Sequence, residues 1–477
     1  MEMPSGLGPI HIIGIGGIGM SAIAEILHAQ GFTVQGSDQK ESANVRRLRA
    51  RGIRVFVGHD AVNLVGARFV VISTAVKDTN PELSAARERG LPIIRRAEML
   101  AELMRLYATI SITGTHGKTT TTSLAANIFE AAAKDPTVIT GGIINAWQSN
   151  ARLGQGDWMI VEADESDGTF TKIPTQIGVV TNIDPEHLDY FGSVEAMHEA
   201  YAAFYANIPF YGLTITCIDH PVVRDLVARL DLRRDGRRMI TYGKSADADI
   251  VLTQTRVEGT STIFSADVSS GPLGKQRTLT DWVVPIPGEH IALNALAAYA
   301  VAVEAGISDD LIKTAMASFS GVKRRFQPTG TWNGVTIYDD YGHHPIEIAA
   351  VLKAAKQGAR GRVVAVVEPH RYSRVQQLFD DFANCLGDAD SVVVAPLYSA
   401  GEAPIESISH EALASGIAAT GHGSVHVAET PDDIPAHVAR LSDPLDIVIV
   451  FGAGHSTEWA HMLPQQLEQL FPVRSAV

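Results

Sequence analysis

Cysteine, positive charge and long apolar runs are scarce in this chain of 477 residues, and each scarcity excludes a class of protein. The two cysteines, Cys217 and Cys385, cannot build a disulfide framework and lack metal-type spacing, so we predict buried thiols in a reducing compartment. The net charge of −14 argues against nucleic acid as a partner, and an anionic substrate would need a local basic cluster. No apolar run reaches the roughly 18 residues of a membrane span, and the first residues do not resemble a signal peptide. We therefore expect no membrane span and a cytoplasmic location.

What the chain does contain is typical of a multi-domain α/β protein. Its hydrophobic fraction is 45%, and its length favours about three domains. Short β-branched runs alternate with helical stretches, as where a strand expected at residues 10–15 leads into a helix expected at 18–29. This alternation predicts parallel sheets covered by helices, whereas the Thr- and Ser-rich residues 250–286 predict an antiparallel patch. We place the domains at residues 1–107, 108–321 and 322–477.

A first glycine cluster follows the first expected strand. Gly14, Gly16 and Gly19 fit the pattern G-x-G-x-x-G, and Asp38 follows a second strand-like segment. Glycines let the backbone approach phosphates, and the start of the following helix favours their negative charge. The pattern indicates either NAD or another nucleotide diphosphate such as a UDP-sugar, and a purely structural tight turn is the remaining interpretation.

A second glycine cluster at residues 114–119 follows another strand and precedes a helix. It ends in Gly117-Lys118-Thr119, as a P-loop does, but Ile112 stands where the first P-loop glycine is expected. The loop N–H groups would hold phosphates, Lys118 would reach the β and γ oxygens, and the Thr119 hydroxyl would bind Mg²⁺. We expect Lys118 to lie in a solvent-facing loop. The pattern predicts an ATP site, with a chance match as the alternative.

Acidic residues and a histidine follow two further expected strands. Glu162 ends an apolar strand and leads into Asp164, Glu165 and Asp167, which suits a metal near a nucleotide or, alternatively, a solvated acidic turn. His187 follows the strand expected at residues 177–183. Because α/β sheets build their sites at strand ends, we predict a functional role for His187.

Taken together, these segments resemble the Mur ligase family, the ATP-dependent ligases that build the cytoplasmic peptidoglycan precursor. The shortened P-loop is characteristic of that family, and the other matching motifs follow in family order along nearly the whole chain. These motifs are residues 14–20, 114–120, 162–167, 287–290, 294–295, 321–326, 339–345 and 369–374.

The resemblance implies a three-domain α/β architecture. It implies a Rossmann-like N-terminal domain for UDP, a P-loop ATPase central domain and a Rossmann-like C-terminal domain for the amino acid. The first glycine cluster then looks like a UDP-sugar site rather than an NAD site. Within the family, the motifs are most similar to the branch that joins L-alanine to the lactoyl carboxylate of UDP-N-acetylmuramate through an acyl phosphate. ATP and Mg²⁺ are the implied cofactors, and the chain would act as a monomer or homodimer.

The resemblance also implies roles for individual residues, which fall into four groups. UDP-sugar contacts would come from Gly14, Gly16, Gly17, Gly19, Met20, Ser37, Asp38, Ser73 and Thr74. ATP contacts would come from Gly114, Thr115, His116, Gly117, Lys118, Thr119, Thr120, His290, Asn294, Arg325 and Asp339. Thr119, Glu162 and His187 would hold Mg²⁺, and Lys118, Glu162 and His187 would be catalytic. His343, His344, Arg371 and Arg374 would lie at the amino-acid end.

The sequence departs from the family pattern at two places. Several family members use a carbamylated lysine near a second magnesium, but this chain has no lysine between Lys172 and Lys244. Ile291 stands where family members often have asparagine. The general base for the amine also stays open between His187, His343 and loss of the proton to water.

Three rival functions remain at this point. A sister ligase would add a whole peptide to the same UDP-muramate. An NAD-dependent oxidoreductase would use the first glycine cluster but would leave Lys118 and Glu162 without a role. A non-catalytic regulator would bind ATP and form no amide.

Overall fold

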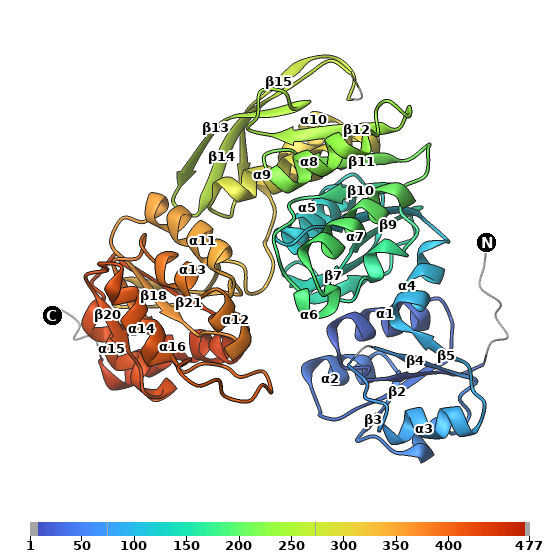
Figure 1. Cartoon of the computed structure of the whole chain (residues 1–477), viewed down its shortest axis with the longest axis horizontal. Coiled ribbons are helices and arrows are strands. Elements are labelled where there is room, and N and C mark those ends of the chain that lie inside the picture. The colour runs from blue at the N-terminus through green and yellow to red at the C-terminus, as the bar shows by residue number, and fades with distance from the viewer. Residues whose placement is uncertain (1–7, 74, 272, 473–477) are drawn as a thin grey trace. The chain divides into compact units, whose positions relative to one another are not determined.

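The computed structural model describes residues 8–73, 75–271 and 273–472. Their strands form three sheets of five, ten and six strands (Figure 1). The chain divides into two compact units. The first comprises Met1–Thr253, Ala266–Thr280 and Leu293–Ser320, and the second comprises Gln254–Ser265, Asp281–Ala292 and Gly321–Val477.

The first sheet holds five parallel strands in the order β3-β2-β1-β4-β5. These are β1 (Ile10–Ile13), β2 (Val34–Asp38), β3 (Arg54–Val57), β4 (Phe69–Ile72) and β5 (Ile93–Arg95). The accompanying helices are α1 (Ile18–Ala29), α2 (Ala43–Ala50), η1 (Ala61–Leu64), α3 (Pro81–Glu88) and α4 (Arg96–Met104). The strand order reverses between β1 and β4, and α/β sheets bind ligands at the carboxyl ends of strands at such a point.

Helix α1 occupies the residues predicted for it, but the strand before it ends at Ile13 rather than at residue 15. Gly14 has a φ of +76°, which ends the extended backbone and turns the chain. The N–H groups of Gly14 and Ile15 both donate to the carbonyl of Ser37. The predicted strand was too long because Ile15 is apolar and buried, like the strand residues before it.

The second sheet has the strand order β15-β14-β13-β12-β11-β10-β6-β9-β7-β8. Its strands are β6 (Ala108–Thr113), β7 (Thr137–Ile144), β8 (Ser149–Arg152), β9 (Trp158–Glu162), β10 (Ile177–Val180), β11 (Leu213–Cys217), β12 (Arg238–Gly243), β13 (Ile250–Glu258), β14 (Ser261–Val268) and β15 (Arg277–Val284). The helices in this stretch of chain are α5 (Lys118–Ala131), η2 (Thr169–Thr171), α6 (Leu188–Phe191), α7 (Val194–Asn207), α8 (Pro221–Leu230), α9 (Glu289–Glu304) and α10 (Asp309–Ala317). Strands β6, β9, β10, β11 and β12 are parallel to their neighbours, so their carboxyl ends share one edge.

The predicted antiparallel patch coincides with β13, β14 and β15. Only residues 259 and 260 separate β13 from β14, and strands that are hydrogen-bonded neighbours across so short a connection run antiparallel.

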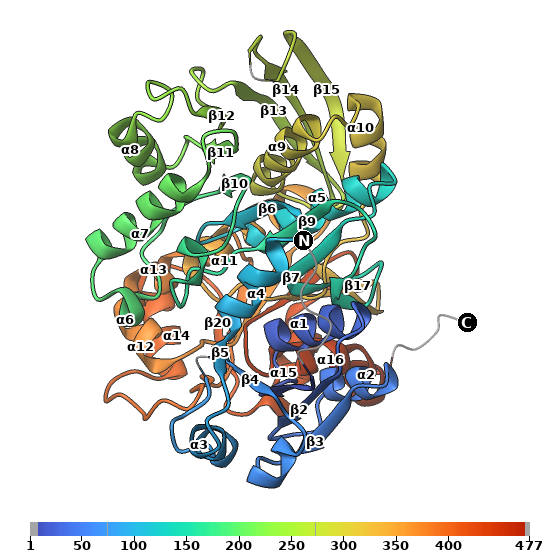
Figure 2. The same cartoon turned by 90° about the vertical axis from the view of Figure 1, so that its right-hand side faces the viewer.

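Helix α1 is shared between the first two sheets. It lies against β7 and β8 of the second sheet as well as covering its own (Figure 2). One buried core therefore includes Ile23 of α1 together with Ile139 and Met159 of the second sheet. The side chain of Asn150 in β8 also donates to the carbonyl of Ile18 at 2.8 Å. These contacts fix the start of α1 relative to the central strands.

The third sheet has the order β16-β17-β21-β18-β19-β20 and is parallel except for the pair β16–β17. Its strands are β16 (Gln327–Trp332), β17 (Val335–Asp340), β18 (Val363–Val367), β19 (Ser391–Val394), β20 (Val425–Val427) and β21 (Ile447–Phe451). Its helices are α11 (Pro345–Gly358), α12 (Tyr372–Gln377), α13 (Phe379–Asn384), α14 (His410–Ala419), η3 (Pro431–Asp433), α15 (Ile434–Leu441) and α16 (Ser456–Leu470). Strand β18 is buried on both faces. Val363 and Val367 enter one core, and Val364 and Val366 enter the other, as expected of a strand covered by helices on both sides.

None of the helices in the described ranges combines the length and the apolar character needed to cross a bilayer.

A buried polar cluster joins α3 to the first sheet. The Glu82 carboxylate accepts hydrogen bonds from Asn63 at 2.6 Å and from the Ser37 hydroxyl, and it lies 3.2 Å from the His11 ring. Burial alone would raise the pKa of Glu82, but the hydrogen bonds from His11, Ser37 and Asn63 hold it below its usual value. The charged carboxylate therefore organises this side of the domain.

We predict that Glu82→Ala destabilises the first domain by about 3 kcal/mol, because it leaves several buried donors without an acceptor. Hydrogen exchange of the amides of β1 and β2, measured at increasing denaturant concentration, gives this loss in the free energy of unfolding. Glu41→Ala is the control, because the Glu41–Arg49 pair is exposed and should contribute little. Equal stability of the two variants would contradict a structural role for the cluster.

Candidate active site

The turn between β6 and α5 is built from glycines that no other residue could replace without strain. Gly114 and Gly117 have φ values of +127° and +83°. A Cβ atom on Gly117 would lie 2.5 Å from the Asn294 side chain, and one on Gly114 would collide with the Thr181 hydroxyl. The turn therefore keeps its backbone bare at the start of α5, where N–H groups suit phosphate oxygens.

The residues that follow β10 hold this turn in place. The Asn182 side chain accepts from the His116 N–H at 2.7 Å, and the Thr181 hydroxyl donates to the His116 carbonyl at 2.7 Å. The Thr115 hydroxyl accepts from the Asp184 N–H at 2.8 Å. Asn182 was not predicted as a site residue, because it fell inside the strand expected at residues 177–183, whereas β10 ends at Val180.

Lys118 is enclosed by acceptors. Its ammonium donates to Glu165 at 2.8 Å, to the Gly114 carbonyl at 2.6 Å and to the Thr115 carbonyl at 3.1 Å. Its side chain is only 14% exposed. The prediction of a solvent-facing loop was wrong, because Lys118 is the first residue of α5 and folds back over the turn.

The charges around Lys118 shift one another's protonation. Burial would lower the pKa of Lys118, but Glu165 and Asp164 outweigh it and raise that pKa. Burial raises the pKa of Glu165 to about 7, with Asp164 adding to the rise and Lys118 opposing it. Burial would also raise the pKa of Asp164, but Lys118 and the Ser166 N–H lower it. Glu165 is thus the carboxylate that most depends on a cation. The acidic run that contains it was predicted to suit a metal, but its pairing with Lys118 was not predicted.

Oxygen atoms suited to a divalent cation flank the lysine. The Thr119 hydroxyl lies 3.0 Å from Glu162, whose other oxygen accepts from Thr140 and from the Gly141 N–H. Hydroxyl and carboxylate oxygens at a phosphate-binding turn fit Mg²⁺. Nearby, ligand atoms of Glu165, Glu186 and His187 lie within 4.8 Å of one another. One oxygen of the buried Glu165 has no hydrogen-bond partner among the described residues, which also fits a cation.

The structure thus brings most of the predicted ATP and metal residues together. Those gathered around the carboxyl ends of β6, β9 and β10 are Gly114, Thr115, His116, Gly117, Lys118, Thr119, Glu162 and His187, with Asn294 of α9 beside Gly117. Thr120 lies in α5 and is buried. His290, Arg325 and Asp339 belong to the second unit, so their predicted contacts with ATP stay predictions.

The predicted UDP-sugar residues lie around the turn after β1. The Gly16 N–H donates to the Asp38 carboxylate at 2.9 Å, and Gly17 precedes the first residue of α1. Gly14 and Gly19 belong to the same turn and helix start, Met20 is buried, and Ser73 follows β4. Ser37 is fully buried, and its hydroxyl forms hydrogen bonds with Glu82 and His59. Its side chain therefore packs inside the domain and not at the surface of the turn. Thr74 lies outside the described residues.

A cavity of about 220 Å³ opens within the first unit between the start of α1, α4, the middle of β7 and the end of β9. Its lining residues are Ile18, Gly19, Ile23, Arg96, Leu100, Ile139, Thr140, Gly141, Glu162, Ala163, Asp164, Thr169, Phe170 and Ile173. The cavity reaches from the glycine turn of the first sheet to Glu162, so one ligand could contact both.

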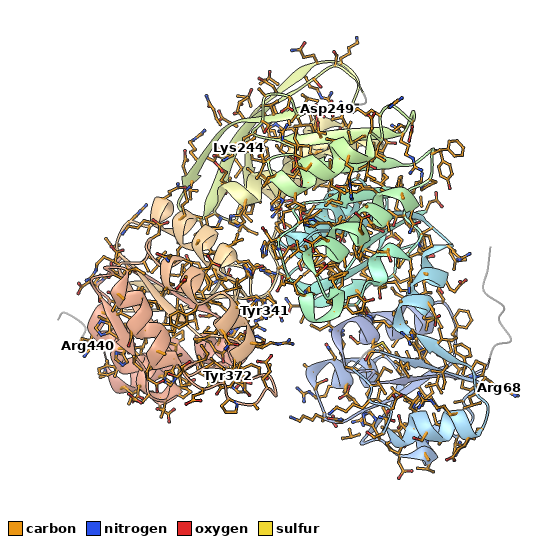
Figure 3. All side chains as sticks on the ribbon, viewed as in Figure 1. Arg68, Lys244, Asp249, Tyr341, Tyr372 and Arg440 are labelled. Atoms are coloured by element: carbon orange, nitrogen blue, oxygen red, sulfur yellow. The ribbon has the colours of Figure 1, made fainter. Side chains whose placement is uncertain are left out.

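In the second unit, the predicted residues cluster at the carboxyl ends of β17 and β18. The Asp340 carboxylate accepts from the Phe326 and Gly342 N–H groups, both at 2.8 Å, and burial raises its pKa to about 6. This holds the segment that carries Arg325, whose guanidinium lies 5.4 Å from the Tyr341 ring centroid (Tyr341 is labelled in Figure 3). Phe326 has a φ of +46°, a left-handed conformation that needs such support.

The predicted amino-acid residues lie beside this segment. The rings of His343 and His370 have centroids 5.5 Å apart, and Arg371 begins the turn into α12 with a φ of +66°. Burial, with the charges of His343, Arg374 and Arg371, lowers the pKa of His370 to about 3. His344 is buried, and its ring accepts a hydrogen bond from the Ile346 N–H at the start of α11, so its predicted contact with the amino acid stays a prediction.

The three sheets and the bare glycine turn before α5 are the arrangement expected of an ATP-dependent ligase. Three family models match, described as the Mur ligase family catalytic domain (residues 9–108), the Mur ligase middle domain (112–302) and the Mur ligase glutamate ligase domain (324–454). The chain belongs to the Mur ligase family. This confirms the predicted three-domain α/β architecture, while the boundaries at 107 and 321 stay predictions.

Individual relatives share most of the chain's length. It is 56% identical over 470 residues to the UDP-N-acetylmuramate–L-alanine ligase of Methylobacterium nodulans, covering 98% of this chain and 99% of that one. It is 55% identical over 470 residues to the enzyme of the same name from Agrobacterium fabrum, with the same coverage. The structure is similar to that of UDP-N-acetylmuramate-alanine ligase MurC from Thermotoga maritima, with a TM-score of 0.81, 26% identity, and coverage of 97% and 100% of the two chains.

We predict that Lys118→Ala lowers the melting temperature by about 5 °C or more, because it strands the buried Glu165 without its cation. Adding Glu165→Gln should restore most of the loss. Thermal unfolding of the single and double variants measures this, with exposed Lys172→Ala as control. A single variant as stable as wild type would show that the ion pair contributes nothing to folding.

We also predict that His370 makes the second unit sensitive to acid. Its folded-state pKa of about 3 lies below the ordinary value of about 6.5, so the unfolded chain binds more protons between these values and stability falls as the pH falls. His370→Gln should therefore lose less melting temperature than wild type between about pH 7.5 and about pH 5.5. Parallel acid sensitivity of the two proteins would exclude His370 as the cause.

Proposed function

We propose that this chain joins L-alanine to the lactoyl carboxylate of UDP-N-acetylmuramate in peptidoglycan synthesis, with ATP converted to ADP and phosphate. One observation carries the proposal. Over 98% of its length, the chain is 55 to 56% identical to proteins named UDP-N-acetylmuramate–L-alanine ligase. The same similarity supports a cytoplasmic location, where ATP and nucleotide sugars are available. Whether the chain acts as a monomer or homodimer stays a prediction.

The geometry supplies what this reaction needs first, which is relief of charge repulsion. The lactoyl carboxylate and the γ-phosphate of ATP are both anionic and repel each other. Lys118 lies at the phosphate-binding turn, and its ammonium is held charged by the surrounding carboxylates. A positive charge in this position stabilises the charge that develops on the transferred phosphoryl group.

Mg²⁺, held by Thr119 and Glu162 with a second ion near His187, would supply further neutralisation of the phosphates. The protein itself would orient the reactants. The turn at residues 114–117 presents backbone N–H groups to the triphosphate, and Asn294 lies beside Gly117 where the nucleotide would pass. The glycine turn at residues 14–19 would hold the UDP group at the other end of the cavity.

The chemistry then proceeds in two steps. A carboxylate oxygen of the muramate attacks the γ-phosphorus, and ADP leaves, which gives an acyl phosphate. The neutral amine of L-alanine attacks the acyl carbon, a tetrahedral intermediate forms, and phosphate leaves with the C–O bond electrons. The proton lost by the amine would pass to His187, to His343 or to water.

The second unit would provide the remaining contacts. Arg371 and Arg374 suit the carboxylate of L-alanine, because a guanidinium binds a carboxylate through two parallel hydrogen bonds. His343 would lie at the same end. Arg325 and Asp339 would contact the phosphates and ribose of ATP, and His290 its nucleotide.

The decisive experiment measures phosphate release by purified protein with ATP, Mg²⁺, UDP-N-acetylmuramate and a panel of amino donors. We expect turnover with L-alanine as the amino donor. We expect little turnover with a tripeptide, which is the donor that the sister ligase would use. UDP-N-acetylglucosamine, which lacks the lactoyl carboxylate, should give none. Lys118→Ala should reduce turnover at least about a thousandfold. Release with the tripeptide but not with L-alanine would overturn the assignment, and ATP binding without any amide product would favour a regulator.

A further inference from the structure

The cavity of the first unit is poor in positive charge for a site that would take an anionic sugar nucleotide. Glu162 and Asp164 contribute carboxylates to its wall, and Arg96 is the one basic side chain among the residues that line it. In a chain of net charge −14, this guanidinium is the feature of the cavity that favours an anion.

The positive charge of Arg96 lies beside a second positive feature, the N-terminus of α1. It is the first residue of α4, and its Nη1 atom lies 3.0 Å from the position that a Cβ on Gly19 would take. Gly19 belongs to the first turn of α1, a helix of 12 residues that has no side-chain cap at its start. The N–H groups of an uncapped helix start attract anionic oxygens. Arg96 therefore adds a second feature that favours an anion beside the start of α1.

The Arg96 guanidinium already forms one ion pair, with Asp167. The Nη2 atom of Arg96 donates to the Asp167 carboxylate at 2.9 Å, and the side chains are 25% and 11% exposed. The other Asp167 oxygen accepts from the Thr169 N–H at 3.0 Å, which fixes the carboxylate in place. A guanidinium carries five N–H donors, so this ion pair leaves capacity for a second anion.

We propose that Arg96 binds an anionic oxygen group of the sugar nucleotide, and that this group competes with Asp167 for the guanidinium. The inference rests on the proposed function, because it names a residue that recognises the same substrate. The two candidate groups are the diphosphate and the lactoyl carboxylate, which share the chemistry that Arg96 recognises.

The exchange connects the sugar-nucleotide site with the carboxylates around Lys118. Asp167 lies in the same short segment as Glu162, Asp164 and Glu165, and Glu165 holds Lys118. Release of Asp167 from Arg96 would change the electrostatic field on this segment. Arg96 is a substrate-binding residue in this account, and Asp167 is a positioning residue that acts through it.

The test uses calorimetric titration of the full-length protein with UDP-N-acetylmuramate and, separately, with UDP-N-acetylglucosamine. Arg96→Gln should bind UDP-N-acetylmuramate about tenfold to a hundredfold more weakly than wild type. Asp167→Asn should bind it about threefold more tightly, because the competing charge is gone. Arg105→Gln is the matched control, since Arg105 follows the same helix and pairs with Glu102 on the surface. Thermal melting of each variant checks that it is folded.

The opposite directions of the two variants distinguish competition from a merely structural ion pair. If Arg96→Gln lowers the affinity for both sugar nucleotides, the group that Arg96 binds is the diphosphate. If it lowers the affinity for UDP-N-acetylmuramate alone, the group is the lactoyl carboxylate. Weaker binding in both Arg96→Gln and Asp167→Asn would reduce the pair to a structural clamp and overturn the proposal, as would unchanged affinity in Arg96→Gln. If wild-type protein bound neither nucleotide, the proposed function itself would fail, which separates the two outcomes.

Discussion

The ammonium of Lys118 lies 2.8 Å from the Glu165 carboxylate at the turn between β6 and α5, and both side chains are largely buried. A buried charge of either sign is costly, so each partner depends on the other. The arrangement keeps a full positive charge at a bare glycine turn, with the oxygens of Thr119 and Glu162 alongside. The Gly114 and Thr115 carbonyls accept from the same ammonium, so the turn closes around this charge.

Two neighbouring strands make the pairing possible. Strands β6 and β9 are parallel and adjacent, so the turn after one and the acidic segment after the other open at the same edge of the sheet. The acidic segment then continues from Glu162 to Asp167, which meets Arg96. A single stretch of chain thus runs from the glycine turn before α5 to the cavity beside α1, where the sugar nucleotide is proposed to lie.

Local patterns allowed the two glycine turns and their helices to be predicted, because backbone conformation at Gly14, Gly114 and Gly117 is set by the glycines themselves. Position after an expected strand indicated Glu162 and His187, and both lie near the turn in the structure. The family motifs added the specific roles proposed for them. The pairing of Lys118 with Glu165 could not be predicted in this way. The two residues are 47 positions apart, and their contact depends on strand order and on burial.

The same limit explains why Asp340 and Asn182 went unnoticed. Each holds a functional segment through hydrogen bonds to its backbone N–H groups, and such bonds leave no pattern in the sequence. A predicted strand bound also failed where a turn begins in an apolar stretch, at Ile15. Local chemistry therefore indicates which side chains react, while the supports that aim them emerge only from the packed structure.

The account predicts that ATP takes Lys118 away from Glu165. A crystal structure with Mg²⁺ and a non-hydrolysable ATP analogue tests this directly. The expected result is a Lys118 ammonium in contact with the β- and γ-phosphates, with Thr119 and Glu162 facing the metal. A nucleotide bound elsewhere, with Lys118 still paired to Glu165, would contradict the role assigned to this lysine.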